Sequence, residues 1–302
     1  MSPPTSLVVR AFAKINLDLT IVGLLPDGYH EVRTVLQSVA LHDTLTFTAV
    51  PGPFAITCTQ PGVPTDARNL VWRAAALLWS VRRDPAAPLA GVRVTLEKRI
   101  PAEAGLGGGS SDAAATLVAL SRLWNLSLDL PSLARLGARL GADVPFFLAG
   151  GTALGSGRGD DVSPLVEPPV TPIVIVKPPF GVPTPDAYGW FDQDRKPKPV
   201  RGTSRTLPGW PAWAHDLRND LEAPVASRFP QIRRTARDLT ALGALHAAMS
   251  GSGSAVFGVF ADETVAAAAH AALTARGETA LLTGTLPGEI VASERQRVLA
   301  GS

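Results

Sequence analysis

The chain has 302 residues, 46% of them hydrophobic and 18% charged, and a formal net charge of +2. The composition is typical of a folded protein, and the length favours two domains, with one large domain as the alternative. Because there is no dense run of Lys or Arg, the charge argues against a nucleic-acid-binding surface and suits an anionic small molecule. A single cysteine, Cys58, and five scattered histidines exclude a disulfide framework and a cysteine-rich zinc site.

The N-terminal segment predicts neither export nor membrane insertion. Residues 1–6 lead into an alternating segment, not into a charged region followed by an apolar core. No stretch reaches the roughly 18 consecutive apolar residues of a membrane-spanning helix. We therefore expect a cytoplasmic protein with a small-molecule substrate and without membrane or nucleic-acid partners. No pattern indicates its oligomeric state.

Apolar residues alternate with polar ones from Ala11 to Ile21, which predicts a half-buried strand with Lys14 and Asn16 on its polar face. The strand should end at Pro26-Asp27-Gly28, because Pro presets φ and Gly permits a positive φ. Further along we expect strands at 44–48 and 92–96, a loop at 51–68, and helices that begin at Asn69, near Ala113 and near Leu133.

Beyond Gly150-Gly151 the composition changes, and Pro and Gly are frequent as far as residue 185. This change predicts two domains, 1–160 and 161–302. In the second domain we expect a surface loop at 191–213, then a helix, a strand at 256–260 and a final Ala-rich helix. Strands and helices mix without a regular βαβ alternation, which favours an α+β fold over a doubly wound parallel sheet.

The most informative segment is Gly105-Leu-Gly-Gly-Gly-Ser-Ser-Asp112, between a predicted strand and a predicted helix. The first N–H groups of a helix are unpaired and carry about half a positive charge, and glycines let the backbone close around phosphate oxygens. The segment has neither the Gly-Lys-Ser/Thr of a P-loop nor the G-x-G-x-x-G spacing. A flexible turn is the alternative, but four glycines within five positions favour phosphate binding. Ser110 and Ser111 can cap the helix, bind phosphate or help to hold Mg²⁺.

A second segment, Met249–Ser254, also combines Gly and Ser and precedes the strand predicted at 256–260. Alone it is typical of an ordinary turn. Together with the first segment, it can form a lid over the same phosphates.

Five polar or aromatic residues are candidates for substrate chemistry. Lys14 and Asn16 lie two residues apart on one strand face. From their spacing alone, we interpret this face as exposed to solvent. Asp143 enters an apolar run, so it can be a helix cap, a turn residue or a desolvated base beside a cation. Tyr29 and His30 follow the Pro-Asp-Gly turn; they can be ordinary surface residues or can stack on and hydrogen-bond a base ring.

Five segments between residues 9 and 260 together resemble the 4-diphosphocytidyl-2-C-methyl-D-erythritol kinase family. This family belongs to the galactokinase, homoserine kinase, mevalonate kinase and phosphomevalonate kinase (GHMP) superfamily. The glycine-rich segment is shared across the superfamily, whereas the Lys-Ile-Asn and Gly-Tyr-His sequences point to this family. The segments are Ala13–Leu17, Asp27–His30, Pro101–Ser111, Gly141–Pro145 and Ser250–Gly253.

The resemblance implies a two-domain α+β architecture of the GHMP kinase type, with the active site in the cleft between the domains. It implies a kinase that uses ATP and Mg²⁺ to phosphorylate the 2-hydroxyl of 4-diphosphocytidyl-2-C-methyl-D-erythritol, in the non-mevalonate route to isoprenoid precursors.

The resemblance also implies roles for residues at matching positions. Asp143 resembles the base that takes the hydroxyl proton, and Lys14 resembles its partner. The counterparts of the substrate contacts are Asn16, Tyr29, His30, Thr184 and Tyr188, with Tyr29 and Tyr188 as the pair that encloses cytosine. The counterparts of the ATP contacts are Pro101, Gly105, Leu106, Gly107, Gly108, Gly109, Ser110 and Ser111, with Asn69 and Lys98 near the adenine. No residue is assigned as a metal ligand.

Two alternative functions remain at this stage. One is another GHMP kinase that acts on homoserine or a mevalonate, but Tyr29, His30 and Tyr188 argue against substrates that have no base ring. The other is a ligand-binding relative that has lost catalysis, but the presence of both Lys14 and Asp143 argues against it.

Overall fold

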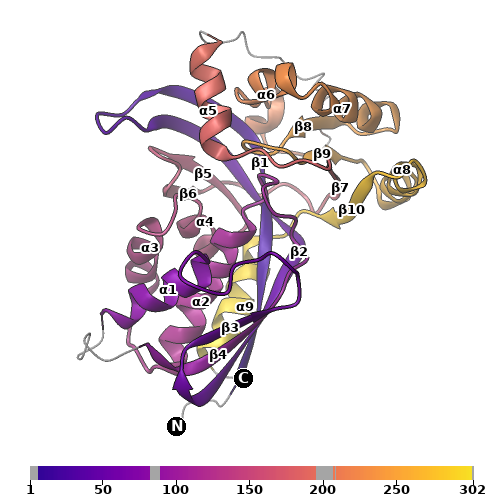
Figure 1. Cartoon of the computed structure of the whole chain (residues 1–302). Coiled ribbons are helices and arrows are strands. Elements are labelled where there is room, and N and C mark those ends of the chain that lie inside the picture. The colour runs from indigo at the N-terminus through magenta and orange to yellow at the C-terminus, as the bar shows by residue number, and fades with distance from the viewer. Residues whose placement is uncertain (1–5, 82–88, 195–206, 208, 301–302) are drawn as a thin grey trace.

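The computed structural model describes residues 6–81, 89–194, 207 and 209–300. Within them, one sheet of six strands and one of four are flanked by helices, so the predicted α+β class is confirmed. Figure 1 shows that α1 to α4 gather beside the first sheet, whereas α6, α7 and α8 lie beside the second. No helix in the described part of the chain is long and apolar enough to cross a membrane.

Two long antiparallel strands form the spine of the molecule: β1 (Ser6–Leu24) and β2 (His30–Pro53). Their hairpin turn contains the predicted Pro26-Asp27-Gly28, where Gly28 has φ 84°. The prediction of a half-buried strand is wrong for the middle of β1, because every residue from Ala11 to Leu17 is buried. The polar face is covered by other elements, and Lys14 and Asn16 are each only 4% exposed.

The first sheet has the order β3-β4-β2-β5-β6, with β1 paired to β2. Part of the loop predicted at 51–68 is the short strand β3 (Ala55–Cys58), which pairs in parallel with β4 (Ala90–Glu97). Ile56 explains the difference, since its side chain is buried in the core of this half. The sheet ends with β5 (Thr152–Ser156) and β6 (Asp161–Pro164).

The helices of the first half are α1 (Leu70–Trp79), α2 (Gly108–Leu123), α3 (Leu130–Ala138) and α4 (Val144–Ala149). Helix α2 is central, because nearly all of its residues from Ser111 onward are buried. Its small residues, such as Ala113 and Ala114, permit close packing against β1. The helix begins about one turn earlier than its apolar spacing predicts, directly at the glycine-rich segment.

The second sheet has the order β10-β7-β9-β8. Its strands are β7 (Pro172–Lys177), β8 (His246–Met249), β9 (Val256–Val259) and β10 (Thr279–Gly284), and its helices are α5 (Thr184–Gln193), α6 (Glu222–Arg228), α7 (Gln231–Ala241) and α8 (Glu263–Ala275). The loop predicted at 191–213 lies largely outside the described residues; its ends belong to α5 and to a 3₁₀ turn at Ala212–Asp216.

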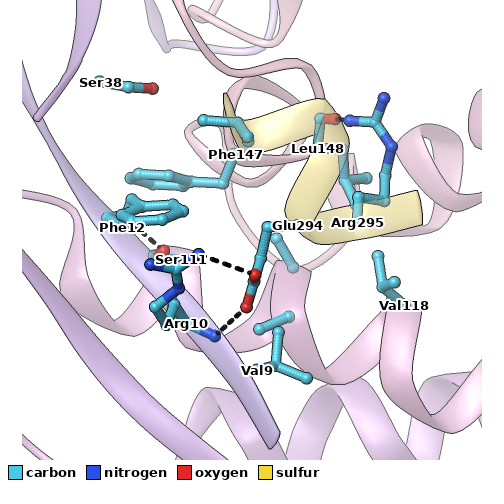
Figure 2. Close-up of a pocket in the computed structure, with 14 residues that line it drawn as sticks. Val9, Arg10, Phe12, Ser38, Ser111, Val118, Phe147, Leu148, Glu294 and Arg295 are labelled. Atoms are coloured by element: carbon cyan, nitrogen blue, oxygen red, sulfur yellow. Dashed lines mark hydrogen bonds and ion pairs between the residues drawn. The ribbon is translucent and has the colours of Figure 1, made fainter. Parts of the chain in front are cut away.

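The last helix, α9 (Gly288–Ala300), returns to the first half and packs against α2 and β1. Figure 2 shows Glu294 of α9 with Arg10 of β1, whose guanidinium donates to it over 3.0 Å. Burial opposes the charge of Glu294, but hydrogen bonds from Arg297 and Arg10 prevail and lower its pKa to about 2. Although α9 lies within the predicted second domain, 161–302, its packing places it with the first half of the chain.

The chain passes from the first sheet to the second between Pro164, the end of β6, and Pro172, the start of β7. Strand β6 still belongs to the first sheet, because it pairs with β5. A domain division at residue 160 therefore separates two paired strands of one sheet. The existence of two folding domains stays a prediction, and its boundary is better drawn after β6.

Candidate active site at the glycine-rich turn

The glycine-rich segment forms a tight turn at the start of α2, and two of its glycines cannot be replaced without a clash. Gly105 and Gly107 have φ of 72° and 70°, which side-chain-bearing residues rarely adopt. A Cβ at Gly105 would collide with the carbonyl of Ser250, and one at Gly107 would lie 2.5 Å from Phe147 Cζ. The backbone of the turn is therefore open only because glycine stands at these positions.

The turn presents backbone donors. The first helical hydrogen bond of α2 runs from the N–H of Ser111 to the carbonyl of Gly107 over 2.9 Å. The N–H groups of residues 108–110 precede this bond, so they have no carbonyl partner within the helix. Leu106 is 1% exposed and anchors the turn in the core. The Ser111 hydroxyl donates to the carbonyl of Phe12 over 2.6 Å. Ser110 therefore has the hydroxyl better placed for a ligand.

A second turn, Met249–Ser254, is joined directly to the first. Ser250 Oγ accepts from the N–H of Asn16 over 3.2 Å and donates to the carbonyl of Gly105 over 2.9 Å. The N–H of Ser254 and that of Ala255 donate to the carbonyls of Glu103 and Ala104. The two glycine-containing segments, one from each half of the chain, thus share one site.

Lys14 lies between these turns, close to the carboxylate of Asp143. Its Nζ is 3.4 Å from Asp143 Oδ2 and donates to Asn16 Oδ1 over 2.5 Å. A Cβ on Gly251 would lie 3.4 Å from the same Nζ, and one on Gly107 would lie 3.2 Å from Lys14 Cε. The interpretation of Lys14 and Asn16 as an exposed strand face is therefore wrong.

Asp143 precedes α4 but makes no hydrogen bond to the N–H groups of that helix, so it is not an ordinary side-chain cap. Its side chain is 36% exposed, whereas that of Lys14 is 5% exposed. The carboxylate can therefore meet a ligand from solvent while it stays beside a buried ammonium group. Such a pair, beside a turn with unpaired N–H groups, can accept a proton from a hydroxyl and stabilise negative charge.

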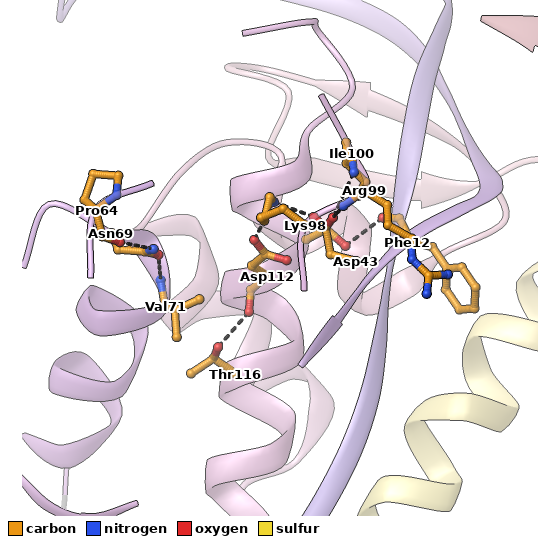
Figure 3. Close-up of polar contacts among 11 residues, drawn as sticks. Phe12, Asp43, Pro64, Asn69, Val71, Lys98, Arg99, Ile100, Asp112 and Thr116 are labelled. Atoms are coloured by element: carbon orange, nitrogen blue, oxygen red, sulfur yellow. Dashed lines mark hydrogen bonds and ion pairs between the residues drawn. The ribbon is translucent and has the colours of Figure 1, made fainter. Parts of the chain in front are cut away.

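Lys98 lies in a closed cluster of charges behind the turn (Figure 3). Its ammonium group donates to Asp43 and, over 2.8 Å, to Asp112 Oδ2. Asp43 also accepts from the N–H groups of Arg99 and Ile100. Burial raises the pKa of Asp112 to about 7, against the opposing charge of Lys98. Burial lowers the pKa of Lys98, but the charges of Asp112 and Asp43 outweigh it, so the net shift is upward.

Both residues expected near the adenine flank the start of α2. A Cβ on Gly108 would lie 3.3 Å from Lys98 Nζ, and one on Gly109 would lie 3.4 Å from Leu70 Cδ1. Asn69, directly before Leu70, is the N-cap of α1: its Oδ1 accepts from the N–H of Val71, and its Nδ2 donates to the carbonyl of Pro64. Asn69 therefore has a structural role in this state, whatever it contributes to nucleotide binding.

The two tyrosines expected to enclose a base have different surroundings. Tyr188 of α5 packs against His30, with ring centroids 4.8 Å apart, and His30 Nε2 is 2.9 Å from Asp192 Oδ1. Tyr29 is 60% exposed, and the guanidinium carbon of Arg158 lies 4.3 Å from its ring centroid. His30 is thus the ring that contacts Tyr188.

A groove of about 480 Å³ lies beside these rings, lined by Ile21 to Leu24, His30, Phe191 and Asp192. Burial, and to a lesser extent the charge of Asp143, raises the pKa of Tyr188 to about 12. Thr184 Oγ1 is 3.0 Å from Ser252 Oγ in the second turn. The structure therefore brings Thr184 and Tyr188 to the edge of the Lys14 site, and the groove extends away from it.

Several residues of this site carry no signal in the sequence. Asp43 and Asp112 hold Lys98 from places 55 and 14 residues away; Asp112 follows Ser-Ser at a helix start, but nothing marks Asp43. Thr34, which accepts from Asn16 Nδ2 over 2.8 Å, is one threonine in a long strand. Only the pairing of distant strands makes them neighbours.

Comparison with known proteins gives consistent matches over most of the chain. The models of the GHMP kinases N terminal domain and the GHMP kinases C terminal match residues 69–151 and 209–279. A 4-diphosphocytidyl-2-C-methyl-D-erythritol kinase from Synechococcus sp. is 43% identical, with 86% of this chain and 87% of the relative covered. One from Moorella thermoacetica is 44% identical, with 85% and 90% covered.

A solved structure gives the same result in three dimensions. A crystal structure of 4-(cytidine 5'-diphospho)-2C-methyl-D-erythritol kinase matches with a TM-score of 0.74 and 35% identity, covering 92% of this chain and 99% of that one.

Proposed function

This chain belongs to the 4-diphosphocytidyl-2-C-methyl-D-erythritol kinase family of the GHMP kinases, and from that premise we propose how its own residues carry out the reaction. The chain is a small-molecule kinase that transfers the terminal phosphoryl group of ATP to the 2-hydroxyl of 4-diphosphocytidyl-2-C-methyl-D-erythritol, in the non-mevalonate route to isoprenoid precursors. One observation carries the mechanism: Lys14 Nζ lies 3.4 Å from Asp143 Oδ2, beside the glycine-rich turn.

The turn at Gly105–Ser111 is proposed to bind the polyphosphate of ATP. Its free N–H groups and the positive end of α2 favour anionic oxygens, and its glycines leave no side chain in the way. Asn69 and Lys98 flank the start of α2, so we place the nucleoside on that side of the turn. Pro101 leads the chain from β4 into the turn.

Asp143 is proposed to accept the proton of the substrate hydroxyl, with Lys14 as the positive partner of that carboxylate. Phosphoryl transfer has a loose transition state, so positioning and charge stabilisation provide most of the catalysis. Lys14 suits both needs, because its ammonium group donates to Asn16, lies 3.4 Å from Asp143 and is close to both turns. Once Asp143 has taken up the proton, its carboxyl group no longer balances the charge of Lys14. That charge can then stabilise the transferred phosphoryl group.

We further propose Mg²⁺ as the cofactor; bound together with ATP, it would supply positive charge to the phosphates. The residues present fit an ion held mainly by substrate oxygens: no group of three His, Cys, Asp or Glu suited to a metal occurs among the described residues. Magnesium sites in kinases commonly use few protein ligands together with phosphates. Of the two serines at the start of α2, Ser110 would be the one to contact the ion, because the hydroxyl of Ser111 donates to the carbonyl of Phe12.

The cytidyl end of the substrate is proposed to lie along the groove beside His30, with Tyr29 and Tyr188 as its aromatic contacts and Asn16 and Thr184 nearer the reacting hydroxyl. Homoserine and mevalonates have no ring that needs this groove, which is why the cytidyl substrate is favoured. ATP is a cytoplasmic cosubstrate, so we further propose that the chain works in the cytoplasm.

A coupled assay of ADP release tests the function. We expect turnover with ATP, Mg²⁺ and the cytidyl substrate, and none with homoserine or mevalonate in its place. Turnover of homoserine alone would overturn the assignment of the substrate, and ATP binding without turnover of any acceptor would support a non-catalytic relative.

Tyr29→Ala tests the base contact. We expect its KM for the cytidyl substrate to rise about tenfold, the loss of one base-stacking contact, while its KM for ATP stays the same. A matched control is Val8→Ala, which removes an exposed apolar side chain from the other end of β1, outside the groove. Equal losses for both substrates in Tyr29→Ala would indicate a general change of the hairpin instead.

A further inference from the structure

A buried asparagine, Asn219, connects strand β1 to the second turn of the site. It is 5% exposed and lies between the 3₁₀ turn and α6. Its Nδ2 donates to the carbonyls of Met249 and Gly251, both over 2.8 Å, and its Oδ1 accepts from the N–H of Leu221 over 3.0 Å. Both hydrogens of the amide are thus used on the two carbonyls that flank Ser250.

The segment that carries Asn219 is itself held by β1, seven residues or fewer beyond Lys14. The N–H of Leu19 donates to the carbonyl of Arg218 over 2.7 Å, and the N–H of Asp220 donates to the carbonyl of Leu19 over 2.9 Å. Asp18 Oδ1 accepts from the N–H of Arg218. The position of Asn219 is therefore fixed relative to β1, the strand that supplies Lys14 and Asn16.

The turn held by Asn219 is the one that encloses Lys14. Gly251 is so close that a Cβ there would lie 2.9 Å from Asn16 Oδ1 and 3.4 Å from Lys14 Nζ. Ser250, between the two bound carbonyls, bridges Asn16 to Gly105. A shift of this turn would therefore move the wall of the Lys14 site and loosen its bond to the glycine-rich turn at once.

The chemistry of an amide suits this task better than that of other side chains. Two carbonyl acceptors need two donors from one planar group, and an aspartate of the same shape would set a carboxylate against both carbonyls. Glu222 adds a third bond to the turn, because its Oε2 accepts from the N–H of Met249 over 2.8 Å. Among the described residues, however, only Asn219 donates to the carbonyl of Gly251.

From these contacts we infer that Asn219 is a positioning residue for phosphoryl transfer, which sets the Ser250–Gly251 turn against Lys14 and so aligns Lys14 with the phosphate-binding turn. This role rests on the proposed kinase reaction. Because the side chain is buried and bonded to the carbonyls of Met249 and Gly251, we assign it an action through the backbone of the turn and no contact with ATP or acceptor.

Asn219→Ala tests the inference through the balance between kcat and KM. We expect kcat to fall about a hundredfold, as a displacement of about 1 Å does at a reacting site, with much smaller changes in both KM values. The matched control is Ile232→Val, a cavity-forming change in the buried core of the same half. Its kcat should equal that of the unaltered protein at a similar loss of thermal stability. An unchanged kcat in Asn219→Ala, or an equal loss in the control, would overturn the inference.

Asn219→Asp supplies a second test if the alanine variant does not fold. A protonated carboxyl group retains one donor, whereas the carboxylate has none, so kcat of this variant should fall as the pH rises through neutrality, relative to the unaltered protein. A ratio of kcat values that does not change with pH would contradict the inference. Turnover by the unaltered protein is measured in the same series, so failure of the proposed function shows there and failure of the Asn219 role shows only in the variants.

Discussion

Lys14 and Lys98 are two buried lysines on opposite sides of one glycine-rich turn, and they are held in opposite ways. Lys98 is enclosed by Asp43 and Asp112, whose side chains are 0% and 3% exposed. Lys14 has a neutral amide and one carboxylate, and that carboxylate is 36% exposed and 3.4 Å away. The closed cluster has little freedom to exchange partners, whereas the open pair can turn to a ligand. Burial of a lysine is therefore not by itself a sign of catalysis.

The largest expected effect breaks the open pair. Asp143→Asn should lower kcat about 10³-fold, because it removes the proton acceptor without changing the shape of the side chain. Nucleotide binding, followed by displacement of a fluorescent ATP analogue, should be unchanged. A kcat within a few fold of the unaltered protein would remove Asp143 from the reaction.

Replacing each lysine by methionine compares the two sites directly. Lys98→Met leaves two buried carboxylates without a cation, so we expect the free energy of unfolding to fall by about 3 kcal/mol. Lys14→Met leaves a carboxylate that water can reach, so the loss should be below about 1 kcal/mol, although kcat falls strongly. Chemical denaturation of both variants measures the difference, and equal losses would show that the two clusters are energetically alike.

Asp112→Asn tests how the stability of the closed cluster around Lys98 depends on pH. The pKa of Asp112 is raised to about 7 in the folded protein, above its unfolded value near 4. The folded state therefore binds more protons than the unfolded state between these limits, and this contribution to stability is lost as the pH rises from about 4 through about 7. The loss amounts to at most about 1.4 kcal/mol per pH unit. The variant should lack this slope in denaturation curves measured across that range, and an unchanged slope would assign it to another group.

The smallest effect concerns a third charged cluster, at the partly exposed contact of α9 with β1. Glu294 has its pKa lowered to about 2 by Arg297 and Arg10, against the effect of burial, so its contribution is present above about 4.5 and is lost as the pH falls through about 2. Because Arg10 is 47% exposed, Glu294→Gln should cost only about 1 kcal/mol at neutral pH. Thermal melting at neutral and acid pH should show the difference between the variant and the unaltered protein shrink in acid. A constant difference would indicate lost packing rather than lost charge.

The local features of the fold could be predicted from short stretches of sequence. The period of two in β1, the hairpin turn at Gly28 and the helix that starts after Asn69 all follow from residues within one turn or strand. The sequence does not predict strand β3, because the strand has only four residues, or the burial of the polar face of β1, because the elements that cover that face are far away in the chain.

The same division holds for the site. The sequence alone determines that a glycine-rich turn precedes α2. The motifs, by their resemblance to a known family, determine the family and the candidate site residues. Only the tertiary structure brings Lys14 to Asp143 across a sequence separation of 129 residues, places Gly251 against that lysine through Asn219, and separates the open charge pair from the closed one around Lys98. The physical reason is that a hydrogen bond or ion pair depends on distance in space, and here each partner comes from a different strand, helix or turn.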